Sequence, residues 1–89
     1  MFKPNKKLGQ NFLNDNKAIR KLVRALDAEG GEIIIEIGPG LGAVTKEIID
    51  NYGYSEDIEI KAVEVDIRFV EKLKNMFYEY KNFEVIPAN

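Results

Sequence analysis

Three glycines fall within five residues, at positions 38, 40 and 42, in the segment EIGPGLG that follows a short apolar run. Glycine tolerates positive φ and lets a ligand approach the backbone N–H groups of a turn closely. Two carboxylates flank this loop in sequence, because Glu36 precedes Gly38 by two residues and Glu64 follows Gly42 by 22 residues. This spacing is typical of a site for a nucleotide-containing cofactor, in which the distant carboxylate accepts the ribose hydroxyls.

Glu36 separates two classes of cofactor. Read as G-x-G-x-x-A through Gly38, Gly40 and Ala43, the loop also fits a dinucleotide fingerprint, so the glycines alone leave the cofactor open. A pyrophosphate is anionic and disfavours a nearby carboxylate, whereas the sulfonium and ammonium groups of S-adenosylmethionine are attracted to one. We therefore expect S-adenosylmethionine and rank an NAD-dependent oxidoreductase last. The expected contacts from this region are Glu36, Gly38, Gly40, Gly42 and Glu64.

Three β-branched runs alternate with three stretches of helical apolar spacing, and these elements must position the loop. The predicted strands are residues 32–37, 58–65 and 83–86, and the nearly continuous apolarity of the first is typical of a strand buried on both faces. The predicted helices run from Asn14 or Asp15 to a stop at Gly30 and Gly31, from the glycine loop to about residue 51, and from Asp66 onward. Their apolar positions are Ile19, Leu22, Val23, Leu26, Leu41, Val44, Ile48, Ile49, Phe69, Val70, Leu73, Phe77 and Tyr80.

This alternation predicts an α/β fold, with a three-stranded parallel sheet and flanking helices. Residues 15–89 would form a Rossmann-like half-domain, because a doubly wound sheet needs a second half beside its first strand. The strand at residues 33–37 should therefore have an open edge, and we expect homodimers to form through it. For Glu64 the plain alternative is that it only ends a strand, while Asp66 is expected to cap a helix.

The composition excludes several kinds of chemistry. The 89 residues contain no cysteine and no histidine, which rules out disulfides, thiolate metal sites and an imidazole base, and we expect no metal. No apolar run approaches the roughly 18 residues that span a bilayer, and the first residues lack the apolar stretch of a secretory signal. We therefore expect no membrane association and a cytoplasmic location.

Charge is divided unevenly along the chain. Residues 1–24 contain seven basic side chains and one acid, whereas the remaining residues contain six basic and 14 acidic side chains. Residues 1–14 are predicted to form a basic arm whose Lys3, Lys6 and Lys7 contact phosphates. The alternative for this arm is a solvated tail.

Residues 8–15 (LGQNFLND), with EIGPGLG and AVEVD downstream, closely resemble the start of the ribosomal RNA adenine dimethyltransferases. Members of that family use S-adenosylmethionine to dimethylate adenines of small-subunit ribosomal RNA, and the resemblance covers essentially all 89 residues. It implies that Asn11 and Leu13 close over the cofactor with Gln10 nearby, although Gln10 and Asn11 could instead satisfy backbone groups of a turn. It also places Asn89 where the family has an aspartate that holds the cofactor adenine.

The family's catalytic Asn-Leu-Pro-Tyr segment has no match in this sequence, and neither has its helical C-terminal domain. We therefore expect a cofactor-binding part of the enzyme, inactive by itself, with no catalytic residue among the 89. One alternative is a methyltransferase half-domain that acts on another substrate. The other is a non-catalytic half-Rossmann module that self-associates or pairs with a partner supplying the remaining strands.

Overall fold

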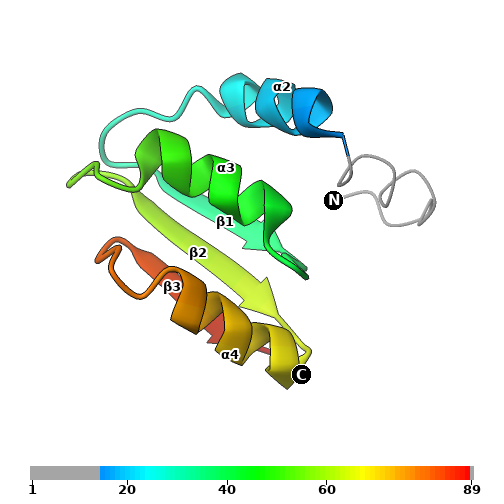
Figure 1. The fold of residues 1–89 in the computed structure, drawn as a ribbon. Helices are drawn as coiled ribbons and strands as arrows, with labels where there is room; N and C mark the ends of the chain where they lie inside the picture. Colours follow the sequence, from blue (N-terminus) through cyan, green and yellow to red (C-terminus); the bar gives the residue numbers. More distant parts are fainter. Residues whose placement is uncertain (1–14, 89) are drawn as a thin grey trace.

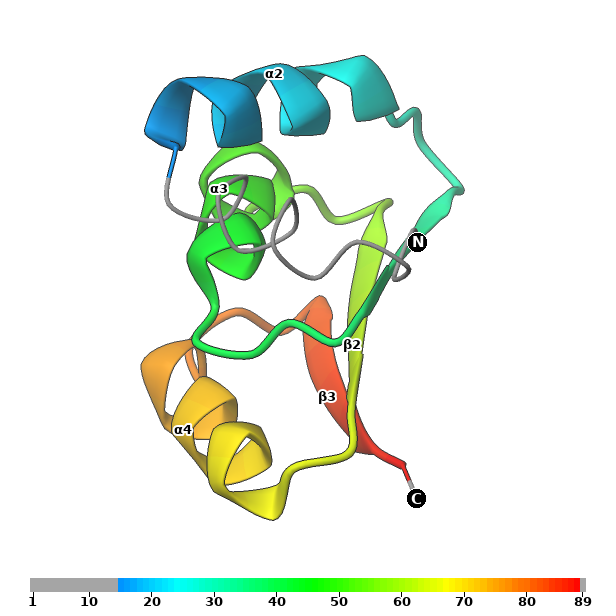
Figure 2. The same cartoon turned by 90° about the vertical axis from the view of Figure 1, so that its right-hand side faces the viewer.

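A three-stranded parallel sheet forms the centre of the computed structural model, which describes residues 15–88. Its strands β1 (Ile33–Ile37), β2 (Glu59–Glu64) and β3 (Phe83–Pro87) lie in the order β1-β2-β3. Helices α2 (Asn16–Leu26), α3 (Ala43–Tyr52) and α4 (Ile67–Met76) alternate with the strands and lie together on one face of the sheet (Figures 1 and 2). The predicted α/β fold with a parallel sheet is confirmed.

The hydrophobic core lies between this sheet face and the helices. Ile34 pairs in register with Ile60 and Ala62 pairs with Val85, and all four side chains are buried. Because side chains alternate between the faces of a strand, Glu36 and Glu64 lie on the same helix-facing side at the carboxyl ends of β1 and β2. Two core residues, Ile58 and Phe77, lie just outside the strands and helices, and the helices contribute Ile19, Val23, Val44, Ile48, Ile49, Val70 and Leu73.

The other face of the sheet carries no helix within residues 15–88. Two right-handed crossovers that step in the same direction place their helices on the same side, so the second face remains open. Ile33, Ile35 and Ile37 of β1 are 51%, 60% and 58% exposed there. The prediction that this strand is buried on both faces is therefore wrong for the described chain, whereas its predicted position at the sheet edge is confirmed.

The helix boundaries follow from caps. Oδ1 of Asp15 accepts the backbone N–H of Ala18 at 3.1 Å at the start of α2, and Asp66 caps α4 as expected. Helix α2 ends at Leu26, before the predicted stop at the glycine pair, because Asp27 adopts a left-handed φ of 43° and closes the helix. Leu41 lies in the loop and is exposed, not helical as predicted.

Candidate functional site

The glycine loop, residues 38–42, joins β1 to α3 at the carboxyl edge of the sheet. Gly38, Gly40 and Gly42 have φ of 69°, 58° and 93°, so all three occupy the conformation that L side chains rarely adopt. A Cβ atom on Gly38 or Gly40 would meet no atom of residues 15–88 within 4 Å. The backbone at these two positions therefore faces open space, as expected for a loop that a ligand approaches.

Gly42 has a different surrounding. A Cβ atom on it would lie 2.9 Å from Cδ2 of Leu73, so this glycine allows the loop to pack against α4. Its N–H donates to the carbonyl of Pro39 at 3.0 Å, and it is the N-terminal cap residue of α3. Gly42 therefore has a packing role in the structure. The sequence pattern alone does not distinguish such a role from contact with a ligand.

Glu64, the last residue of β2, holds the loop through its side chain. It is 5% exposed, and its Oε1 accepts the Gly40 N–H at 3.0 Å while its Oε2 accepts the Asp66 N–H at 2.9 Å. One carboxylate therefore joins the glycine loop to the start of α4, so Glu64 does more than end a strand. Each of its oxygens has a second lone pair that can accept another hydrogen bond.

Glu36 lies half-buried on the same side of the sheet. Its Oε1 accepts a hydrogen bond from Oγ1 of Thr45 at 2.5 Å, and Thr45 is fully buried in the first turn of α3. Burial, with a smaller contribution from the charge of Glu64, raises the pKa of Glu36 to about 7 despite the bond from Thr45. The Glu36 carboxyl is therefore divided between its neutral and charged forms near neutral pH.

Together these groups make a polar cradle beside open backbone. Two carboxylates on neighbouring strands face the same side, and one of them is bonded to the loop that has room for a ligand. Such a cradle suits a molecule with hydroxyl donors and a cationic group. Within residues 15–88, no three acidic side chains are placed to hold a metal ion.

Comparisons with known proteins agree with this geometry. The family profile described as Ribosomal RNA adenine dimethylase matches residues 1–89. The chain belongs to this adenine dimethylase family. The resemblance found in the LGQNFLND and EIGPGLG segments is thereby confirmed.

Curated relatives of this dimethylase family carry the name Ribosomal RNA small subunit methyltransferase A. The chain is 38% identical over 84 residues to the one from Hahella chejuensis, covering 94% of this chain and 29% of the relative. It is 40% identical over 87 residues to the one from Mycoplasma capricolum, covering 98% of this chain and 30% of the relative. The chain thus spans less than a third of the length of these relatives.

Solved structures of Rossmann-like methyltransferases share the fold of this chain. The crystal structure of the 23S rRNA methyltransferase ErmE matches with a TM-score of 0.68 and 25% identity, covering 84% of this chain and 29% of that protein. A carbon methyltransferase, CurJ, shares the fold with a TM-score of 0.65 at 20% identity, covering 83% of this chain and 20% of that protein. The Rossmann-like half-domain predicted from the sequence is confirmed as a fold class.

The structure describes part of the predicted site. It brings Glu36, Gly38, Gly40 and Glu64 together, and it adds Thr45, which sequence reasoning missed. The sequence contains a signal for Thr45, because its hydroxyl lies three residues after Gly42, in the first turn of the helix that follows the glycine loop and therefore close to the site. The remaining predicted positions lie outside the described residues: Gln10, Asn11, Leu13 and Asn89 for the cofactor, and Lys3, Lys6 and Lys7 for RNA.

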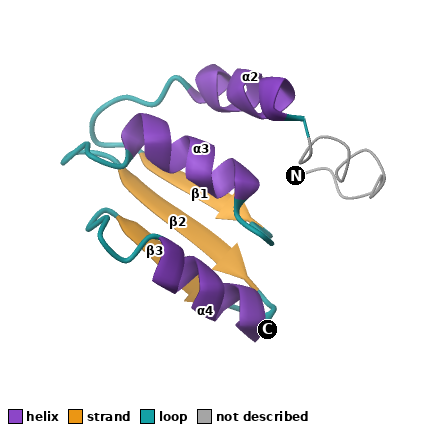
Figure 3. Ribbon diagram, in the orientation of Figure 1, coloured by secondary structure: helices purple, strands orange, loops and turns teal. Residues whose placement is uncertain are grey.

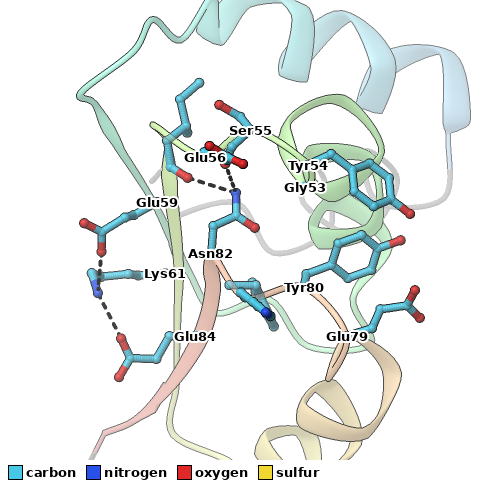
Figure 4. A pocket seen from close by; sticks show the side chains of 13 residues that line it. Gly53, Tyr54, Ser55, Glu56, Glu59, Lys61, Glu79, Tyr80, Asn82 and Glu84 are labelled. Carbon is cyan, nitrogen blue, oxygen red and sulfur yellow. Dashed lines mark hydrogen bonds and ion pairs between the residues drawn. The ribbon is translucent and has the colours of Figure 1, made fainter.

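A hollow lies at the opposite, amino-terminal edge of the sheet (Figure 4). It has a volume of about 530 Å³, and its lining includes Tyr54, Lys61, Tyr80 and Asn82. Nδ2 of Asn82 donates to three backbone carbonyls at 2.9 to 3.1 Å, and Lys61 forms ion pairs with two glutamates. These groups hold the ends of loops and strands, and ligands of open parallel sheets bind at the carboxyl edge, so the glycine loop remains the candidate site.

Proposed function

We propose that this chain binds S-adenosylmethionine at the glycine loop, as part of an enzyme that dimethylates adenine in small-subunit ribosomal RNA. The observation that carries the proposal is the Glu64 carboxylate, which is bonded to the Gly40 N–H beside backbone that faces open space. Family membership and the name of the curated relatives support the substrate. Because that substrate is ribosomal RNA, we also propose a cytoplasmic location.

The residues have separate roles in this proposal. Glu64 accepts the ribose hydroxyls through the lone pairs that its two backbone partners leave free. Gly38 and Gly40 admit the methionine part against the backbone, and Glu36 attracts its cationic groups. We further propose, from the family resemblance, that Gln10, Asn11 and Leu13 close the site and that Asn89 contacts the adenine.

When bound, S-adenosylmethionine supplies an electrophilic methyl group on a sulfonium. The cradle residues contribute position, because a held cofactor removes the entropy cost of bringing the methyl group to an amine. We assign no catalytic residue to this chain, and we propose that the 89 residues hold the cofactor without completing the catalytic site. Primer extension on ribosomal RNA should accordingly find no methylation by this chain alone.

Calorimetry with three ligands tests the cofactor assignment. We expect S-adenosylmethionine and its demethylated product to bind the chain weakly, because only part of the cradle lies within it, and we expect no binding of NAD. NAD carries a pyrophosphate, which the Glu36 carboxylate beside the glycine loop would repel, whereas a carboxylate at the position of Glu64 would suit either cofactor. Binding of NAD in place of S-adenosylmethionine would overturn the proposal.

We propose that two copies of the chain associate through β1, because this strand has one neighbour among the described strands and exposes Ile33, Ile35 and Ile37. Light scattering is expected to give about twice the monomer mass. Ile35→Lys should restore the monomer, while Tyr54→Lys, which alters an exposed aromatic residue away from this face, should not. A monomer whose Ile34 and Ile35 amides are strongly protected from exchange would contradict the proposal.

A further inference from the structure

Helix α2 carries four cationic side chains and no acidic one. They follow the spacing i, i+3, i+4, i+7, which places them on one face of the helix, and all four are exposed. On the opposite side, Ile19 and Val23 are 3% and 1% exposed and pack into the core. We call the outward face the α2 cationic stripe; it consists of Lys17, Arg20, Lys21 and Arg24.

The stripe has no evident role in stabilising the described fold. The ion pairs found within residues 15–88 involve Lys46, Lys61 and Arg68, and none involves the stripe. Like charges four residues apart repel each other on a helix, as Lys17 and Lys21 do here. Lys17 in the first turn opposes the helix dipole, whereas Arg24 in the last turn favours it. The repulsion between neighbouring cations would be relieved by an anionic partner.

The position of the stripe favours contact with a ligand near the candidate site. Helix α2 begins on the side of the molecule where β1 ends and the glycine loop lies (Figure 3). From Lys17 to Arg24 the helix rises about 10 Å, which is about three steps between neighbouring phosphates on one strand of a duplex, so the four side chains can reach roughly four successive phosphates. The residues that precede α2 include Lys3, Lys6 and Lys7, so the positive charge continues along the sequence.

We propose that the α2 cationic stripe binds the phosphate backbone of RNA, an inference that rests on the proposed function for its substrate class. Long lysine and arginine side chains without fixed partners neutralise phosphates but present no rigid array for reading bases. The contact is therefore independent of RNA sequence. It holds the RNA on the side of the molecule from which the glycine loop is approached.

An anionic membrane is the competing partner, since basic amphipathic helices also bind lipid surfaces. Such binding inserts the apolar face of the helix among the lipids. In α2 that face is already partly occupied, because Ile19 and Val23 are buried in the core while Leu22 and Leu26 remain 41% and 43% exposed, and insertion of the whole face would unpack the helix from α3. The packing therefore favours RNA.

The test replaces the whole stripe with glutamine, which retains helix propensity and leaves the buried residues unchanged. Affinity for a small-subunit ribosomal RNA fragment is measured at several salt concentrations. We expect the slope of log K against log salt to become shallower by about 3, since each lost phosphate contact removes about 0.7 for a single strand. The substitutions are Lys17→Gln, Arg20→Gln, Lys21→Gln and Arg24→Gln.

A control variant removes exposed cations from the other end of the molecule, through Lys72→Gln, Lys74→Gln and Lys81→Gln, and should leave the slope nearly unchanged. A second variant, with Lys3, Lys6 and Lys7 changed to glutamine, measures the proposed contribution of the basic arm separately. An equal loss of slope in the stripe and control variants would overturn the inference, because it would indicate nonspecific charge. So would an unchanged slope together with lost binding to anionic lipid vesicles.

Calorimetry separates failure of this inference from failure of the proposed function. The stripe variant should bind S-adenosylmethionine as the parent does, because none of its changed residues belongs to the glycine loop or the two carboxylates. An unchanged salt slope with normal cofactor binding rejects the stripe alone. If the parent chain binds no S-adenosylmethionine, the proposed function fails, whatever the RNA slope shows.

Discussion

Glu64→Ala is expected to weaken binding of S-adenosylmethionine by roughly ten- to 150-fold. The loss corresponds to about 1.5 to 3 kcal/mol, the range for a hydrogen bond to a charged group. The variant removes the proposed ribose acceptor and also leaves the N–H groups of Gly40 and Asp66 without their present partner. Calorimetry measures the affinity, and amide hydrogen exchange at these two residues measures the order of the loop.

Two further variants locate the cause of the loss. Glu64→Gln preserves the shape of the side chain but replaces one acceptor oxygen with an NH2 group. This NH2 group would face one of the two backbone N–H donors, so we expect this variant also to bind the cofactor poorly. Glu84→Ala removes the same charge from an exposed position on β3 and should bind the cofactor as the parent does. If Glu64→Ala binds as tightly as the parent, the ribose assignment is wrong.

The parts of the site that could be predicted are those set by local sequence. Gly38 and Gly40 were predicted because a tight turn with positive φ needs glycine whatever surrounds it. The Asp66 cap depends only on the start of its own helix. Thr45 was missed because its bond to Glu36 exists only once α3 packs on the sheet.

Coverage of the sheet could not be predicted from apolarity alone. The sequence EIIIEI is apolar on both faces of β1, but the helices of residues 15–88 cover only one of these faces. The apolar pattern indicates that both faces favour burial, but it does not identify what covers the second face. Similarly, the glycine pair at 30 and 31 was the strongest stop signal, yet a left-handed Asp27 ended the helix earlier. The basic character of residues 1–24 can be predicted by counting charges. The side on which the cations of α2 lie depends on how this helix packs in the structure.

Glu36 should give stability and cofactor affinity opposite dependences on pH. Its pKa is raised from 4.5 to about 7 in the folded chain. Below about pH 4.5 Glu36 is protonated in both the folded and the unfolded state, so it has no effect on stability there. As pH rises to about 7, the folded state must accept a buried charge beside Glu64. The free energy of unfolding should therefore fall by up to about 3 kcal/mol from this residue across that window.

Cofactor affinity should rise over the upper part of the same window, because only the ionised Glu36 carboxylate attracts a sulfonium or ammonium group. With a pKa of about 7, its ionised fraction increases about eightfold between pH 6 and pH 7.5, and affinity for S-adenosylmethionine should increase by up to that factor. Staying below pH 7.5 limits titration of the ligand's own amino group, whose pKa is ordinarily about 8.

Glu36→Gln is the matched variant, since its amide oxygen can still accept the Thr45 hydroxyl while the side chain stays neutral at every pH. We expect it to be more stable than the parent at pH 7.5 and nearly equal to it below pH 4.5, and to bind S-adenosylmethionine with little pH dependence. Denaturant unfolding of both chains at about pH 4 and at about pH 7.5 compares their stabilities, and calorimetric titrations between about pH 6 and pH 7.5 compare their affinities. If the parent's affinity is as independent of pH as that of the variant, Glu36 does not contact the cationic part of the cofactor.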